Sequence, residues 1–360
     1  MIKPYVLAPG SKIGILGGGQ LGKMTALAAA GLGYKTSIFC PDPDSPAFIC
    51  CDHALIAEYD DETALKMFAD QVDVITFEFE NIPLKSAEFL SQYRPLYPAA
   101  HILKITQHRL YEKDFLNQIN IPTTLYISIK NDEDINNARS FTGFPAILKS
   151  ARMGYDGKGQ ISVQDYSDLK KAWDQLGQVE SILEAKVNFL CEISVIVARN
   201  IHGQIECFEP VENIHKHHIL YETRVPASIS DDLKKQSLVI AEKIAQELKL
   251  IGVLAIEMFV VEDQLLVNEL APRPHNSGHW TLDASYTSQF EQLVRAICGL
   301  PLGSPKRHSN AVMINLLGDD IKKWQSFLQD PTIKLHIYGK TEPKPGRKMG
   351  HITKVFPLEK

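Results

Sequence analysis

The chain has few cysteines, and they stand in no pattern that would bind a metal or form a disulfide scaffold. Six cysteines occur in 360 residues, without a CxxC pair and without the cysteine and histidine spacing of zinc sites. Small secreted domains, by contrast, contain cysteine at high density. The pattern excludes a disulfide-stabilised secreted module and suits the reducing cytoplasm, where we expect the protein to be located.

Long apolar runs and an excess of positive charge are also missing. No segment approaches the roughly 20 apolar residues that span a membrane, and residues 1–11 contain no apolar core of a signal peptide. The formal net charge is −5, so we expect no broad basic surface for nucleic acid. We therefore expect neither a membrane nor a nucleic-acid partner, although local basic clusters could bind a small phosphorylated molecule.

What the chain does have is enough length for several hydrophobic cores. With 360 residues, of which 44% are hydrophobic and 22% charged, it has the composition of an ordinary globular protein with two or three domains. In the first hundred residues we expect strands at 12–16, 35–39 and 72–77 and helices at 20–30, 61–69 and 83–90. This alternation predicts a doubly wound α/β domain.

The rest of the chain mixes strands and helices without a regular alternation. We expect strands near 125 and at 146–149, 181–184 and 193–198, and a helix at 231–248. Strand runs interleaved with longer helices indicate an α+β domain. From residue 301 a third segment begins, with an apolar strand at 312–317 and a basic stretch at 340–348.

Two glutamates stand in apolar segments that are expected to pair as a hairpin. Glu257 lies in the first strand and Glu269 in the second. A three-residue turn at 262–264 would set the two carboxylates opposite each other, where they repel unless a cation lies between them. A hard divalent cation such as Mg2+, carrying nucleotide phosphates, would fill this place. The alternatives are an edge hairpin whose acids face water, or a two-residue turn, which would offset the pair.

Two glycine-rich segments could approach phosphate groups closely. The first, GGGQLG at 17–22, lies between a strand and a helix and fits the pattern of dinucleotide-binding proteins. Close helix packing, or another phosphate at the helix N-terminus, would explain it equally. The second, KSARMGYDGKGQ at 149–160, has the glycines and cations of a loop that covers a polyphosphate. An exposed hairpin tip has a similar composition.

Two polar clusters follow in the second half of the chain. Residues 268–281, NELAPRPHNSGHWT, follow an apolar strand, and two prolines stiffen them so that Arg273, His275 and Asn276 can converge on one ligand. Residues 338–340 and 345–351 together hold three cations among glycines. We expect an ordered basic turn there in preference to a solvated tail.

Taken in order, these motifs resemble one known family. GGGQLG, KSARMGYDGKGQ, EAKVNFLCEIS, EMFVVEDQLLVNELAPRPHNSGHW and GKTEPKPGRKMGHIT are similar to segments of the N5-carboxyaminoimidazole ribonucleotide synthases, ATP-grasp enzymes of purine biosynthesis. The resemblance implies an ATP-grasp fold of α/β and α+β class. We expect an N-terminal doubly wound domain at 1–100, an ATP-grasp domain at 101–300 with a lid near 124–185, and a small C-terminal domain at 301–360. It further implies that a cytoplasmic homodimer carboxylates 5-aminoimidazole ribonucleotide with bicarbonate, using ATP and Mg2+.

The resemblance also implies roles for individual residues. Nucleotide contacts would come from Arg109, Lys149, Gly154, Tyr155, Asp156, Gly157, Lys158, Gly159, Gln160, Glu184, Ala185, Lys186, Val187, Glu192, His215, Asn268 and Glu269. The ribonucleotide and bicarbonate would contact Gln20, Leu21, Glu78, Tyr155, Arg273, His275, Asn276, Lys340, Arg347 and Lys348. Mg2+ would be bound by Glu257 and Glu269. The glycine turn at 17–22 becomes a cradle for the substrate phosphate, and Asp156, His275 and Lys340 are the candidates for proton transfer.

Three other functions stay open on the sequence alone. A related ATP-grasp ligase could use formate and a different ribonucleotide, although the segment GRKMGHIT at 346–353 favours the carboxylase. An NAD-dependent oxidoreductase could be built on the first βαβ unit. A noncatalytic nucleotide sensor would have lost part of the machinery, whereas the carboxylate pair and the basic residues are present here.

Overall fold

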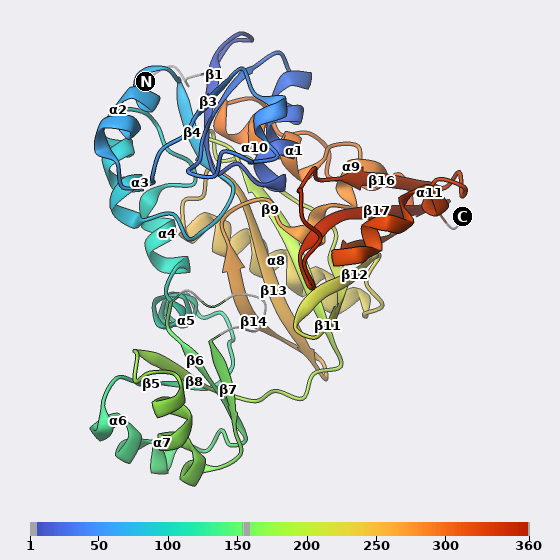
Figure 1. The fold of residues 1–360 in the computed structure, drawn as a ribbon. Helices are drawn as coiled ribbons and strands as arrows, with labels where there is room; N and C mark the ends of the chain where they lie inside the picture. Colours follow the sequence, from blue (N-terminus) through green and yellow to red (C-terminus); the bar gives the residue numbers. More distant parts are fainter. Residues whose placement is uncertain (1–5, 153, 155–158, 359–360) are drawn as a thin grey trace.

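Three β-sheets organise the chain, of which the computed structural model describes residues 6–152, 154 and 159–358. Figure 1 shows the N-terminal sheet at the top, a long central sheet, and a small sheet at the bottom of the view. The strands and helices named from the sequence are present, and their ends differ from expectation by at most two residues. Within the described ranges, no helix combines the length and the apolar character needed to cross a bilayer.

The first sheet is the predicted doubly wound unit. Its parallel strands, in the order β3-β2-β1-β4, are β1 (Lys12–Leu16), β2 (Lys35–Phe39), β3 (His53–Leu55) and β4 (Val74–Phe77). Helices α1 (Gln20–Gly31), α2 (Glu62–Asp70) and α3 (Leu84–Ser91) follow β1, β3 and β4. Ile13 and Ile15 pack with α1, whereas Leu16 and Phe77 pack with α2 and α3. Both faces are therefore covered, which explains the continuously apolar strands.

The second sheet has nine strands and carries most of the candidate residues. Its order is β14-β13-β9-β11-β12-β15-β17-β16, and β10 pairs with β9. The strands are β9 (Cys191–Arg199), β10 (Ile205–Cys207), β11 (Val211–Lys216), β12 (Ile219–Val225), β13 (Gly252–Val261), β14 (Gln264–Ala271), β15 (Asn310–Leu317), β16 (Ile333–Ile337) and β17 (Lys348–Phe356). The last three come from the C-terminal segment. That segment thus extends the central sheet and forms no separate one.

Helices cover both faces of the central sheet. Val195 and Val197 of β9 pack with α8 (Asp231–Glu247), and Ile196 and Ala198 pack with α10 (Gln289–Ile297). Successive residues face opposite sides of a strand, so β9 is buried on both faces. Further helices outside the small third sheet and its two helices are α4 (Ala100–Thr106), α5 (Arg109–Gln118), α9 (Thr281–Ala284), α11 (Trp324–Phe327) and the 3-10 helices η1 (Phe48–Cys50), η2 (Ala138–Ser140), η3 (Asn276–Gly278) and η4 (Gly318–Lys323).

The third sheet occupies the region expected to form a lid. Its antiparallel strands, in the order β5-β8-β6-β7, are β5 (Tyr126–Ile129), β6 (Ala146–Ser150), β7 (Gln160–Val163) and β8 (Ser181–Ala185). Helices α6 (Asp132–Asn137) and α7 (Tyr166–Gln175) pack against it around Trp173 and Leu169. The division of the chain near residues 100 and 300 stays a prediction.

The β13–β14 hairpin corrects one expectation and confirms another. Val261 pairs with Gln264, so the turn has two residues, and Glu262 has a φ of 53° in the left-handed region. The predicted three-residue turn was therefore wrong. A two-residue turn alone would set Glu257 opposite Asn268, but a β-bulge places the extra residue there, and Glu257 pairs with Glu269. The predicted opposition of the two glutamates is confirmed.

Two buried charged residues of α5 hold the bulge in place. The strand β14 is an edge of its sheet, and edge strands expose unpaired backbone groups. Lys113 Nζ donates to the carbonyls of Val267 (3.0 Å) and Asn268 (2.8 Å), and Glu112 accepts from the amide of Leu270 (3.0 Å). Both residues are at most 3% exposed. Burial raises the pKa of Glu112 to about 8 and lowers that of Lys113.

We predict that Lys113→Met destabilises the protein through this contact. The change leaves two buried carbonyls without a donor and removes the cation beside Glu112, a loss of about 3 kcal/mol. Thermal unfolding should show a midpoint lowered by several degrees. The control is Lys66→Met, which removes an exposed ion pair to Asp70 on α2 and should change the midpoint little. Equal shifts in the two variants would contradict the role given to Lys113.

Candidate functional site

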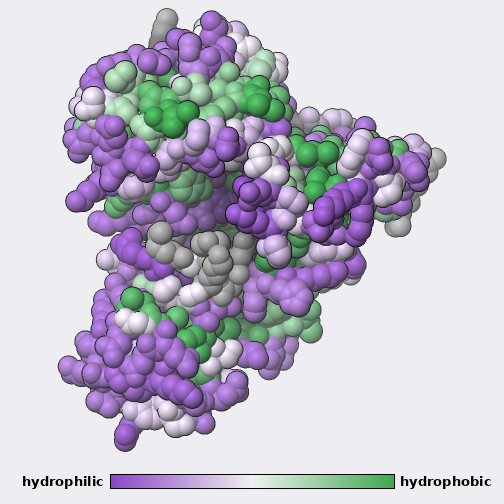
Figure 2. Space-filling view, in the orientation of Figure 1, coloured by the Kyte–Doolittle hydropathy of each residue, from purple (hydrophilic) through white to green (hydrophobic). Residues whose placement is uncertain are grey.

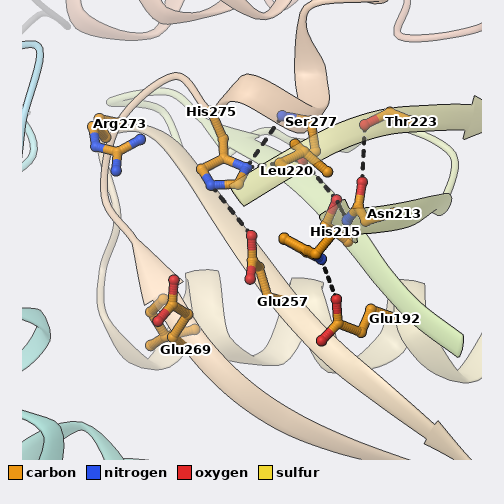
Figure 3. A network of polar contacts seen from close by, with 12 residues as sticks. Glu192, Asn213, His215, Leu220, Thr223, Glu257, Glu269, Arg273, His275 and Ser277 are labelled. Atoms are coloured by element: carbon orange, nitrogen blue, oxygen red, sulfur yellow. Dashed lines mark hydrogen bonds and ion pairs between the residues drawn. The ribbon is translucent and has the colours of Figure 1, made fainter. Parts of the chain in front are cut away.

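Candidate residues of the central sheet and of the C-terminal segment lie close to the N-terminal unit, since Arg273 contacts Glu80 and Lys340 senses the charge of Glu78. Figure 2 shows hydrophilic surface around a hollow between the N-terminal unit, at the top, and the C-terminal strands, at the right. Figure 3 shows Glu257, Glu269, Arg273 and His275 close together on the β13–β14 hairpin and the loop that follows it. The site is therefore built around this hairpin.

The two hairpin carboxylates are in unequal surroundings. The side chain of Glu257 is 17% exposed, and that of Glu269, on the edge strand, is 41% exposed. Burial, followed by the negative charge of Glu269, raises the pKa of Glu257 to about 8. The arrangement is thus unfavourable for two anions by themselves. Carboxylate oxygens are the ligands that Mg2+ prefers, so the residues present fit a divalent cation.

His275 lies beside Glu257 on the loop after β14. Its Nε2 is 3.3 Å from Oε1 of Glu257, and its Nδ1 is 2.9 Å from the hydroxyl of Ser277. Gln289 holds the backbone, because its side chain accepts from the amide of His275 (2.8 Å) and donates to the carbonyl (2.7 Å). Burial, followed by the charge of Arg273, lowers the pKa of His275 well below its usual value.

Arg273 makes an ion pair that sequence reasoning missed. Its guanidinium contacts both carboxylate oxygens of Glu80, one through Nη2 at 2.9 Å. The side chains are 16% and 25% exposed. Glu80 follows β4, at the carboxyl edge of the parallel sheet where ligands of such sheets bind. This position, beside the candidate Glu78, was the signal that could have identified it. The pair joins the N-terminal unit to the central sheet.

The glycine turn at 17–22 holds a side chain of the protein itself. Glu78 accepts from the amides of Gly19 and Gly22, the latter at 2.7 Å. A Cβ at Gly19 would lie 2.6 Å from Glu78 Oε1, so the glycine admits this carboxylate. The carboxyl group of Glu78 thus satisfies amides at the N-terminus of α1, although burial raises the pKa of this glutamate. The expected phosphate cradle, and equally a dinucleotide pyrophosphate, would compete with Glu78 for these amides.

Gln20 and Leu21, the other two candidate residues of this turn, have different surroundings. Gln20, the first residue of α1, is partly exposed. Leu21 is 8% exposed and packs with Met24, Phe290 and Tyr338. Its side chain therefore belongs to the core, and substrate contact through that side chain is not supported here.

The basic turn before β17 is ordered, as predicted. The carbonyl of Arg347 accepts from Gly318, and its guanidinium donates to the carbonyl of Glu342 (3.0 Å). Burial, followed by the charge of Arg347, lowers the pKa of Lys340 to about 8, although Glu78 acts in the opposite direction. The charge of Lys348 acts against the rise in the pKa of Glu257. The basic turn therefore faces both the glycine turn and the hairpin.

A second group of charges lies where the small sheet meets the central one. Lys149 and Glu184, from β6 and β8, form an ion pair of 2.8 Å and are almost buried. Burial alone would raise the pKa of Glu184, but Lys149 and Lys113 hold it at about 2. Arg109 lies 3.6 Å from Glu269. Lys113 was not found from the sequence, because a lysine in an amphipathic helix is usually solvated.

Several residues predicted to contact the nucleotide also form bonds within the protein. The amides of Ala185 and Lys186 donate to the carbonyls of Leu125 and Pro145 (both 2.8 Å), so they are already used within the protein. Val187 follows directly in the chain. Glu192 and His215, on β9 and β11, form an ion pair. Burial opposes the charged imidazole, but Glu192 raises the pKa of His215 overall.

The glycine loop is described only at its two ends. The carbonyl of Gly154 accepts from Arg109 (3.4 Å). Gly159 has a φ of +70°, and its carbonyl accepts from the amide of Ser150 (2.9 Å). Gln160 pairs with Lys149 in the β6–β7 ladder. Four predicted site residues lie outside the described residues: Tyr155, Asp156, Gly157 and Lys158.

Asn276 has the surroundings expected of a ligand-binding residue. It is 9% exposed, and neither Nδ2 nor Oδ1 has a hydrogen-bond partner among the described residues. Buried polar groups are nearly always hydrogen-bonded, so an unpartnered buried amide calls for a partner outside the chain. Asn276 follows directly after His275, whose ring contacts Glu257.

Three segments of the chain match known domain families. They are the ribonucleotide synthetase preATP-grasp domain at residues 11–107, the ATP-grasp domain at 114–290 and the phosphoribosylaminoimidazole carboxylase C-terminal domain at 311–357. The N5-carboxyaminoimidazole ribonucleotide synthase of Bacillus subtilis (strain 168) is 44% identical over 353 residues, covering 97% of this chain and 92% of that protein. The bifunctional purine synthesis protein purC/E of Dictyostelium discoideum is 47% identical over 371 residues, covering 97% of this chain but 37% of that longer protein.

The structure is also similar to a solved one. An ADP complex of an N5-carboxyaminoimidazole ribonucleotide synthetase matches with a TM-score of 0.94 and 41% identity, covering 98% of this chain and 94% of that one. The fold and the acidic hairpin define an ATP-grasp enzyme, which is a ligase. More particularly, the chain belongs to the N5-carboxyaminoimidazole ribonucleotide synthase family. The resemblance and the fold class inferred from the sequence are confirmed.

We predict that Lys340 loses its proton near pH 8 in the ligand-free protein, because burial and Arg347 both disfavour the ammonium ion. NMR of isotopically labelled lysine side chains would follow the titration, and Lys340→Arg would assign the signal. Arg347→Gln removes the nearby cation and should move the midpoint to higher pH. An unchanged midpoint in Arg347→Gln would show that the two cations do not interact.

Proposed function

We propose that the chain carboxylates 5-aminoimidazole ribonucleotide with bicarbonate and ATP, forming N5-carboxyaminoimidazole ribonucleotide, ADP and phosphate. The observation that carries the proposal is the opposed pair Glu257 and Glu269, with His275 and Arg273 beside it, in a chain that matches the family from its first sheet to its last strands. The names of the relatives support the substrate.

We infer that the nucleotide binds between the small sheet and the hairpin. Lys149 and Arg109 would supply positive charge to the phosphates of ATP, and the glycine loop would supply close backbone approach. Glu257 and Glu269 would hold Mg2+, which when bound would supply positive charge against those phosphates. Glu192 and His215 would line the far side of the nucleotide.

The ribonucleotide would bind across the hollow, opposite the nucleotide. Lys340, Arg347 and Lys348 would hold its 5′-phosphate, because arginine and lysine make charge-assisted hydrogen bonds to phosphate. Gln20 and Glu78 lie at the glycine turn, on the side that Lys340 faces. Asn276 offers its unpartnered amide to bicarbonate. The substrates therefore meet beside the hairpin.

Bicarbonate is a poor electrophile, which is why the reaction consumes ATP. Transfer of the γ-phosphoryl group to a bicarbonate oxygen yields carboxyphosphate and ADP. The exocyclic amine then bonds to the carboxyl carbon, either directly or after CO2 is released in the closed site, and phosphate leaves. A base takes one proton from the amine, and the candidates are Asp156, His275 and Lys340.

We make separate proposals for the compartment in which the protein is located and for its oligomeric state. All six cysteines are unpaired thiols, which supports a reducing cytoplasm. The homodimer is inferred from the family, and analytical ultracentrifugation would test it. We also propose that 1–100, 101–300 and 301–360 are the domains, with the small sheet as the lid.

The function is tested by ADP formation in the presence and absence of each substrate. ADP should form quickly only when both the ribonucleotide and bicarbonate are present. Activity with formate in place of bicarbonate would indicate the related ligase. A thermal shift with NAD but none with ATP would indicate the oxidoreductase.

We predict that Glu269→Gln abolishes ADP formation and leaves the fold intact. The amide keeps the size of the side chain but removes the charge that would hold Mg2+. The matched control is Glu262→Gln, an exposed acid in the turn of the same hairpin, which should keep full activity. Normal turnover of purified Glu269→Gln would refute the metal assignment.

We predict that Arg347→Ala weakens binding of the ribonucleotide alone. Loss of one charge-assisted contact to phosphate, about 1.5–3 kcal/mol, corresponds to a KM raised roughly tenfold to a hundredfold. The KM for ATP should hardly change. Lys344→Ala serves as the control, because Lys344 is an exposed cation of the same turn whose side chain is 68% exposed. A raised KM for ATP instead would place the basic turn in the nucleotide site.

A further inference from the structure

A buried chain of hydrogen bonds runs from His275 into the central sheet (Figure 3). The hydroxyl of Ser277 lies 2.9 Å from His275 Nδ1, and Ser194 donates to Ser277 at 2.7 Å. Asn213 Nδ2 donates to Ser194 at 2.9 Å, and Thr223 donates to Asn213 Oδ1 at 3.0 Å. The chain connects the candidate site to three neighbouring strands, β9, β11 and β12.

Burying the polar side chains of this hydrogen-bond network costs free energy. Ser194, Asn213, Thr223 and Ser277 are at most 5% exposed. Apolar side chains of similar volume would fill the same space without the cost of removing hydroxyl and amide groups from water. Fully satisfied polar networks do, however, fix a single arrangement of their members. The arrangement that is fixed here ends on the imidazole of His275.

The amide of Asn213 gives the chain a direction. Its NH2 group only donates and its oxygen only accepts. Because Ser194 accepts from this NH2 group, its own proton points to the hydroxyl of Ser277. The proton of Ser277 then points to Nδ1 of His275. Nδ1 is therefore an acceptor, and the proton of the neutral ring lies on Nε2.

The other contacts of His275 agree with this direction. The backbone amide of Ser277 also donates to Nδ1, at 3.4 Å. Nε2 lies 3.3 Å from Oε1 of Glu257. With the Asn213 amide turned round, every hydroxyl would reverse, and Nδ1 would have to carry a proton although the backbone amide of Ser277 already directs its hydrogen at that nitrogen. The orientation in the structure avoids this conflict between two donors.

We propose that Ser277, Ser194 and Asn213 are positioning residues that hold His275 in the Nε2-protonated tautomer, with this N–H directed at Glu257. The proposal rests on the proposed function only in taking His275 as part of the active site. It has a chemical consequence. A neutral His275 then donates a hydrogen bond from Nε2 and cannot accept a proton at that atom. The base for the amine is therefore Asp156 or Lys340.

The tautomer can be measured in the ligand-free protein by 15N NMR of labelled histidine. Protonated and unprotonated ring nitrogens have clearly separated chemical shifts, and His275→Gln assigns the signals. We expect Nε2 to carry the proton. Asn213→Asp is the decisive variant, because a carboxylate can only accept. Ser194 must then donate to Asp, the hydroxyls reverse, and the proton moves to Nδ1.

A second variant and a control complete the test. Ser194→Ala cuts the chain and should give a mixture of the two tautomers. Thr353→Val is the matched control, since Thr353 is fully buried in the same sheet and its hydroxyl has no partner in the described part of the chain. It should keep the wild-type tautomer. In turnover, Asn213→Asp should lower kcat about tenfold and leave the KM for ATP unchanged. Thr353→Val should change neither kcat nor KM.

Two results would overturn the proposal. One is a wild-type His275 protonated at Nδ1. The other is a wild-type tautomer in both Asn213→Asp and Ser194→Ala, with unfolding midpoints showing that the variants fold. A loss of turnover without a change of tautomer would make these residues merely structural. If the wild-type protein forms no ADP with the ribonucleotide and bicarbonate, the proposed function fails, while the NMR result still decides the tautomer.

Discussion

The repulsion between Glu257 and Glu269 is the constraint on which the rest of the site depends. The β-bulge at Asn268 sets the two carboxylates opposite each other, and burial with this repulsion raises the pKa of Glu257. Such a pair persists only if the surrounding structure imposes it. Lys113 and Glu112 do so from α5 by bonding to the backbone on both sides of the bulge. The protein thus holds two carboxyl groups opposite each other before a cation arrives.

The sequence predicted the elements well because their signals are local. Apolar periodicity located the strands and helices, and the order of the motifs identified the family. The opposition of Glu257 and Glu269 was also predicted, but through a turn that does not exist. A two-residue turn and a bulge give the same pairing as a three-residue turn. Nothing in Val267, Asn268 or Glu269 marks the extra residue, because bulges depend on the partner strand and on the helix that packs against them.

The remaining contacts lie between elements far apart in the sequence and could not be read from local pattern. The glycine turn fits a phosphate site by composition, yet the side chain of Glu78, which follows β4, bonds to its amides. Arg273 was predicted as a substrate contact, and its ion pair with Glu80 across the boundary of two sheets was not foreseen. Ser194 and Asn213 lie on different strands, β9 and β11, and belong to no common sequence motif. Only the pairing of β9, β11 and β12 shows that they form one network with His275.

The C-terminal strands belong to the same hydrogen-bonded sheet as the acidic hairpin. Four strands separate β13 from β17, and all of them are joined by backbone hydrogen bonds. The basic turn and the hairpin consequently cannot move apart without breaking strand pairing, whereas the small sheet is separate. The span from the basic turn to the paired acids is therefore set by the sheet that joins them. A molecule whose phosphate stands at a different distance from its reacting group could satisfy one end or the other, but not both. Selection by length would thus follow from backbone pairing alone.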